Sequence, residues 1–192
     1  MKAVPLSRYL IFLAIAGVGL VADLATKKYV FDWLGPHGAR TYWLWKDVFG
    51  FQSNLNPGAL FGIGAEWPPM RYVTSTLSII AAIAIVVWLF AARAARDPVL
   101  TIALACVLAG ILGNLYDRLG LPGLSEGGHP IYKVRDWVLM VIFGYHWPNY
   151  NIADSLLVCG AGLVIWRAFM ADSLEKPAET LEPSAEQEAR DQ

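Results

Sequence analysis

Residues 72–92, YVTSTLSIIAAIAIVVWLFAA, decide the fold of this chain. The stretch contains no Asp, Glu, Lys or Arg, and a helix needs about 20 apolar residues to cross a bilayer. It therefore predicts a membrane-spanning helix. Further apolar blocks at residues 9–30, 98–116 and 152–170 predict three more spans. The first block also resembles a signal peptide, but its pattern continues helically past residue 22 and favours an uncleaved helix.

Composition supports a membrane protein. The chain has 192 residues, of which 56% are hydrophobic and 16% are charged, whereas soluble domains are about one quarter charged. We expect one domain over residues 1–171. Residues 172–192 carry seven acids against two bases and no aromatic residue, which predicts a disordered, acidic cytoplasmic tail.

The connections between the spans are rich in aromatic residues, which gather at membrane interfaces. Residues 41–45, TYWLW, indicate a short β-like segment between the first two helices. We expect residues 119–150 to form a periplasmic loop between the third and fourth helices. The predicted fold class is thus an all-α membrane protein with four transmembrane helices. Arg93 and Arg96 in the short middle turn favour termini on the cytoplasmic side.

Ionisable residues near the ends of the spans need an explanation, because each costs about 2.5–3.5 kcal/mol to insert. Asp23 and Lys27 are four residues apart, so they share a helix face and can form an ion pair. Asn151 is the expected N-cap of the fourth helix, which places Asp154 in its first turn.

Asp154 and Asp136 lie near the same membrane face in this arrangement. Two close carboxylates share one proton, so one can activate water while the other donates to a carbonyl, as in aspartic hydrolysis. Asp117 is a rival partner for Asp154. Which acid is the base stays open, since a coupled pair titrates as a unit.

Other chemistries lack support in the sequence. It has no HExxH zinc motif, no Gly-x-Ser-x-Gly elbow and no phosphate-binding loop, and nothing indicates nucleic-acid binding. Two alternatives remain open. One is a proton or cation transporter that relays through Asp23, Asp117 and Asp154, and the other is a non-catalytic assembly subunit of the membrane.

Four motifs together resemble bacterial lipoprotein signal peptidase, or signal peptidase II. They are residues 23–27 (DLATK), 56–62 (NPGALFG), 110–118 (GILGNLYDR) and 151–155 (NIADS). They occur in the family's order, one near each predicted span, and the resemblance covers the chain from the first helix to the fourth.

The resemblance implies a monomeric aspartic endopeptidase of the bacterial inner membrane with its active site near the periplasmic face. Its partners would be membrane lipids and its substrates diacylglyceryl-modified prolipoproteins, cut just before the lipidated cysteine. No metal or cofactor is implied. The catalytic pair maps to Asp136 and Asp154. The substrate-binding or supporting positions map to Asp23, Lys27, Asn56, Gly110, Asn114, Arg118 and Asn151.

The chain departs from the family's pattern before Asp136. The family usually has a short gap followed by Val-x-Asp-Phe, whereas this chain inserts the Gly-rich residues 119–133 and reads Val134-Arg135-Asp136-Trp137. The insertion is a candidate lid, because it is Gly-rich and lies beside the site. Arg135 directly beside the acid is unexpected.

Overall fold

The computed structural model describes residues 3–58, 67 and 69–175. The alanine-to-glycine segment at residues 59–62 of the second motif and the predicted tail beyond residue 175 lie outside these residues. Four helices are long and apolar enough to cross a membrane, at Leu6–Leu34, Met70–Ala91, Pro98–Arg118 and Ile152–Ala171. The prediction of four apolar spans is confirmed.

The helices follow the apolar blocks. Helix α1 runs over Leu6–Leu34 without a break at the possible cleavage region. Helix α2 spans Met70–Val86 and continues as the π-helical turn η2, Val87–Ala91. A 3-10 turn, η3 (Ala94–Arg96), leads into α3, Pro98–Arg118. Helix α4 spans Ile152–Glu175.

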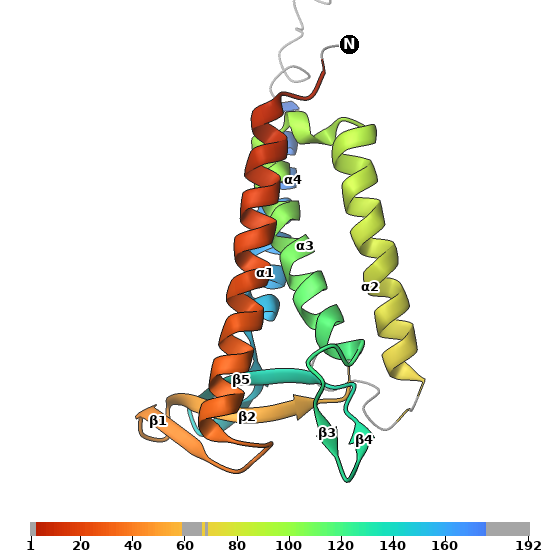
Figure 1. Cartoon of the computed structure of the whole chain (residues 1–192). Helices are drawn as coiled ribbons and strands as arrows, with labels where there is room; N and C mark the ends of the chain where they lie inside the picture. The colour runs from red at the N-terminus through yellow and green to blue at the C-terminus, as the bar shows by residue number, and fades with distance from the viewer. Residues whose placement is uncertain (1–2, 59–66, 68, 176–192) are drawn as a thin grey trace, which may run out of the picture.

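Helix α3 is the centre of the bundle, because over half of its apolar window is buried. It packs against α1, α2 and α4 (Figure 1). Glycines allow the closest approach, since a Cβ on Gly110 would overlap the carbonyl oxygen of Ala153 at the start of α4. A core of Phe12, Ile85, Leu89 and Leu104 fills the bundle away from the sheet.

A four-stranded antiparallel sheet lies across the end of the bundle opposite the N-terminus (Figure 1). Its order is β1-β2-β5-β6. The strands are β1 (Thr41–Trp45), β2 (Phe49–Asn56), β5 (Val134–Ile142) and β6 (Tyr145–Tyr150). A small hairpin, β3 (Ser125–Glu126) with β4 (His129–Pro130), precedes β5.

The all-α prediction is wrong, because the chain also forms this sheet. The expectation of a loop over residues 119–150 is wrong as well. That connection supplies β5, one of the two central strands, and β6, an edge strand. The physical reason is that β5 is buried almost throughout, so its residues 137–142 form a continuous apolar run without the alternation typical of a strand. Its partner β2 lies some 80 residues earlier, as in the pairing of Asn54 with Asp136. Val138 and Trp137 pack on the end of α1 at Val30 and Leu34.

Candidate active site

A buried ion cluster joins α1 to α3 just beneath the sheet. Lys27 Nζ lies 2.7 Å from Asp23 Oδ2 and 3.1 Å from Asp117 Oδ2, and all three side chains are fully buried. The predicted Asp23–Lys27 ion pair is therefore confirmed. Lys27 also donates to Asn114 Oδ1 (3.0 Å) and to the Gly113 carbonyl oxygen (3.4 Å). Burial of these charges is tolerated because each has an opposite partner and further hydrogen bonds.

Lys27 decides how the amide of Asn114 is turned. An ammonium group can only donate, so the amide oxygen of Asn114 must face it. The Nδ2 group of Asn114 then points the other way and donates to Asp154 Oδ1 at 2.8 Å. The buried lysine thereby provides Asp154 with a hydrogen-bond donor through one intermediate side chain.

The start of α4 is organised around Asn151, which is fully buried. Its Oδ1 accepts from the Asp154 backbone N–H (2.9 Å), and its own backbone N–H donates to Asp154 Oδ2 (3.1 Å). This reciprocal pair is a capping box, and it confirms Asn151 as the N-cap. Asp23 Oδ1 accepts from the next free amide of the first turn, Ala153 N–H (2.9 Å). The first turn of α4 is thus held by two side chains, one of them from α1.

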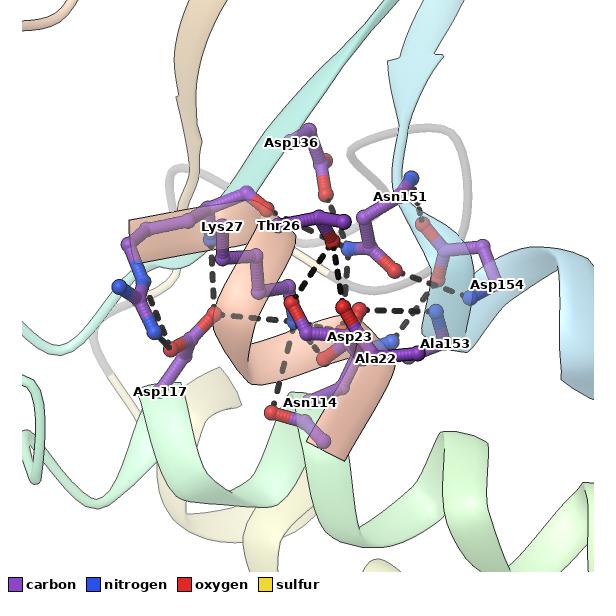
Figure 2. A network of polar contacts seen from close by, with 12 residues as sticks. Ala22, Asp23, Thr26, Lys27, Asn114, Asp117, Asp136, Asn151, Ala153 and Asp154 are labelled. Atoms are coloured by element: carbon purple, nitrogen blue, oxygen red, sulfur yellow. Dashed lines mark hydrogen bonds and ion pairs between the residues drawn. The ribbon is translucent and has the colours of Figure 1, made fainter. Parts of the chain in front are cut away.

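Asp136 reaches the same residue from the sheet (Figure 2). Asn151 Nδ2 donates to Asp136 Oδ1 at 2.6 Å, and Asn56 Nδ2 donates to Asp136 Oδ2 at 3.1 Å. Burial, and secondarily the nearby Asp154, raise the pKa of Asp136 from 3.8 to about 7, against the lowering effects of the two amides and Lys27. At neutral pH this carboxyl therefore holds a proton for much of the time.

A cavity of about 600 Å³ is lined by Asp154 and by Asn56, the amide that donates to Asp136. Its polar end is formed by Asp154, Asn114, Asn56 and Arg118. Among the described residues, Arg118 has neither a hydrogen bond nor an ion pair, so its guanidinium can receive a ligand. The remaining lining is largely apolar and comes from α3, α4 and strands β5 and β6, with Ser78 contributed by α2. The apolar members are Ile111, Val134, Met140, Ile142, Trp147, Tyr150, Leu157 and Val158.

The structure brings most of the predicted site residues together. Seven of them form one hydrogen-bonded network: Asp136, Asp154, Asn56, Asn114, Asn151, Asp23 and Lys27. Arg118 lines the adjoining cavity. Gly110 has no polar role and instead allows α3 to contact α4. Asp117, the rival acid, is turned toward Lys27 and Arg135 instead.

One interaction that the sequence did not predict is the ion pair between Arg135 and Asp117, with Nη2 of the arginine 2.8 Å from Oδ1. These residues belong to a strand and a helix separated by the insertion, so no helical or strand spacing relates them. The signal that could have revealed this pair is Arg135 itself, a charged residue next to Asp136 in an otherwise apolar segment. Among the described residues, no group of three or more His, Cys, Asp or Glu side chains could hold a metal ion.

Residues 15–170 match the family model described as signal peptidase (SPase) II. A lipoprotein signal peptidase of Rhodopirellula baltica is 43% identical over 172 residues, covering 87% of this chain and 75% of the relative. One from Rhodococcus jostii is 35% identical over 82% of this chain and 72% of its own length.

Two solved structures of bacterial membrane enzymes have a similar fold. A bacterial membrane enzyme determined by the in meso method at 2.3 Å resolution superposes with a TM-score of 0.70 and 28% sequence identity, covering 88% of this chain and 93% of that one. A second such enzyme, at 1.9 Å, gives a TM-score of 0.66 at 28% identity over 82% and 91% of the two chains.

Proposed function

The chain belongs to the signal peptidase II family and is a lipoprotein signal peptidase, and we propose that Asp136 and Asp154 are its two catalytic acids. The observation that carries this proposal is that both carboxylates accept hydrogen bonds from Asn151, and that one of them, Asp154, lines a largely apolar cavity. An aspartic peptidase needs two acids close enough to share a proton. The transporter and assembly-subunit alternatives are superseded by membership of a peptidase family.

The surroundings of the two acids divide their roles. Asp154 lies in the first turn of α4, where a negative charge is favoured by the helix dipole. It also accepts from Asn114 Nδ2 and from the Asn151 backbone N–H. Asp136 is buried in the sheet, and its raised pKa favours the protonated form. We therefore assign the shared proton to Asp136 and the negative charge to Asp154.

Hydrolysis then follows with a balanced set of transfers. The Asp154 carboxylate takes a proton from water, whose oxygen attacks the scissile carbonyl carbon, while Asp136 gives its proton to the carbonyl oxygen. The product is a neutral gem-diol. Asp136 next takes a proton from one of its hydroxyls as Asp154 protonates the leaving nitrogen, and the C–N bond breaks. Both acids return to their starting states.

The cavity supports the class of substrate. Its apolar lining suits the acyl chains of a diacylglyceryl-cysteine, and the polar residues Asp154, Asn114 and Arg118 of the same lining suit the peptide bond just before that cysteine. Arg118 and Asn114 can donate to the peptide carbonyl groups. The prolipoprotein is therefore bound by its lipid and cut at the amino side of the lipidated cysteine.

The remaining features of the enzyme are proposed with it. Residues 1–171 form a single domain, monomeric in the inner membrane and surrounded by lipid. The 172–192 tail, whose residues 172–175 continue α4, lies in the cytoplasm. The aromatic strands lie at the end opposite the N-terminus, which supports a periplasmic active site and cytoplasmic termini. The insertion as a lid remains a prediction.

The test is cleavage of a diacylglyceryl-modified prolipoprotein peptide by the purified protein in detergent. Asp136→Asn and Asp154→Asn are each expected to abolish turnover while the thermal unfolding transition is retained. Normal turnover by either variant would overturn the assignment of the pair. Loss with Asp117→Asn alone, with both other variants active, would transfer the catalytic role to Asp117.

A further inference from the structure

Asp117 is a buried junction at the end of α3. Its Oδ1 accepts from Arg135 Nε (3.0 Å) and Nη2 (2.8 Å), so the guanidinium binds this oxygen through two donors. Its Oδ2 accepts from the Arg135 backbone N–H (3.0 Å) and lies 3.1 Å from Lys27 Nζ. One carboxylate thus holds both the side chain and the backbone of Arg135. Arg135 is 5% exposed and Asp117 is fully buried.

Arg135 directly precedes the proposed catalytic Asp136 on β5. Successive side chains of a strand point to opposite faces, so Arg135 reaches Asp117 on one face while Asp136 reaches Asn56 and Asn151 on the other. The arginine charge is therefore directed away from the cavity and neutralised. What it contributes to the site is the position of the backbone that carries Asp136.

Two features make such a fixed point necessary in this chain. The insertion of residues 119–133 separates α3 from β5, and a longer connection constrains the ends that it joins less strongly. In addition, the β2–β5 pairing is irregular between Phe51 and Asn54, directly beside the partner of Asp136. A strand with a local irregularity is not held in register by its pairing alone at that point.

We propose that Arg135 is a positioning residue, whose buried pair with Asp117 sets the place of Asp136 relative to Asp154. The pair substitutes for the short connection that the insertion interrupts. This inference rests on the proposed role of Asp136. It explains together the two departures from the family's pattern, which are the insertion of residues 119–133 and the arginine beside the acid.

The test uses a variant that removes the pair without leaving a buried charge. In the double variant Arg135→Met with Asp117→Asn, the amide oxygen of residue 117 can take the place of Oδ2 and keep its bonds to Lys27 and to the backbone N–H. Lys27 remains balanced by Asp23. Arg135→Lys is the conservative variant, which keeps the charge but lacks the fork of the guanidinium. Lys133→Met, which removes an exposed cation two residues away, is the matched control.

Steady-state cleavage of the lipidated peptide is measured as a function of pH, with folding followed by thermal unfolding. We expect the folded double variant to lose about 10–100-fold in kcat, since a small misplacement of a catalytic group has effects of this size, while KM stays within about twofold. Arg135→Lys is expected to recover part of the loss. The control is expected to match the unmodified protein.

The pH profile separates positioning from general destabilisation. The charged groups that face Asp136 are Asp154 from α4, Lys27 from α1 and Arg118 from α3. A displaced β5 admits water to Asp136, so the alkaline limb of kcat is expected at lower pH in the variant. An unchanged kcat and an unchanged alkaline limb of the pH profile in the double variant would overturn the inference. If the double variant does not fold, Arg135→Lys with the kcat of the unmodified protein would overturn it. An unmodified protein that leaves the peptide intact would instead refute the proposed function.

Discussion

Replacing Asp136 by asparagine is expected to remove activity and, at alkaline pH, to stabilise the protein. The pKa of Asp136 is raised from 3.8 to about 7, mainly by burial and then by Asp154. Between these two pH values the folded protein keeps a proton that the unfolded chain releases. The folded state is therefore favoured least when the pH exceeds 7, and the free energy of unfolding falls as the pH rises through this window. Asparagine is neutral at every pH, so the variant does not lose stability in this way as the pH rises.

The size of the effect follows from the width of the window. At 1.36 kcal/mol per pH unit, roughly three units correspond to about 4 kcal/mol at full extent. Part of this gain is offset, because both oxygens of Asp136 accept from amide groups. An asparagine must turn its own NH₂ toward one of these donors, at a cost of about 1–3 kcal/mol. That cost does not depend on pH. The advantage of the variant should therefore grow by about 3 kcal/mol from pH 5 to pH 8.

The assay is equilibrium or thermal unfolding of both proteins in the same detergent at pH 5, 6, 7 and 8. Asp32→Asn is the matched control, because this acid is largely exposed and pairs with Lys28 on the surface of α1. Its difference from the unmodified protein should stay nearly constant over the same range. A difference for Asp136→Asn that is equally constant between pH 5 and pH 8 would show that the buried carboxyl does not hold the proton.

Three further results are expected. The rate constant kcat/KM should fall as the pH rises through about 7, because Asp136 then loses the proton it donates, and a flat profile from pH 6 to pH 9 would contradict that role. Lys27→Met should cost about 3–5 kcal/mol of unfolding free energy by leaving buried acids unpaired, whereas Lys28→Met on the exposed side of the same helix should cost less than about 0.5 kcal/mol. Gly110→Ala should lower the free energy of unfolding by about 1–3 kcal/mol, seen as a lower melting temperature, since its Cβ would overlap α4. Gly17→Ala, where a Cβ meets open space, should be neutral or stabilising.

The sequence predicts the helical part of this enzyme well because hydropathy acts locally. A block such as residues 72–92 needs no partner to be recognised as a span. The local signals at the start of α4 were equally readable, since the N-cap Asn151 and the acid three residues later lie within one turn. Motif resemblance extended the prediction to residues that only the fold brings together.

The β-like segment predicted at residues 41–45 is confirmed as strand β1. The rest of the sheet and the Asp117–Arg135 pair could not be predicted, for a common physical reason. Each depends on contacts between segments far apart in the chain, and the spacing within one segment carries no information about them. Strand β5 adds a second difficulty, because its burial on both faces removes the alternation by which a strand is recognised. An arginine in such a strand requires a buried acid, but the sequence alone does not say which acid.

The capping of α4 has a consequence for how the enzyme is made. The turn that begins this last helix is completed by Asn151 within it and by Asp23 from the first helix. The same turn presents Asp154 to Asp136 through Asn151. With Asp136 and Asp154 as the proposed catalytic pair, a chain whose α4 has not docked lacks the Asn151 bridge between them. We therefore expect substrate turnover to begin only once α4 has packed against α1 and β5, so that turnover reports the assembly of the helix bundle with the sheet.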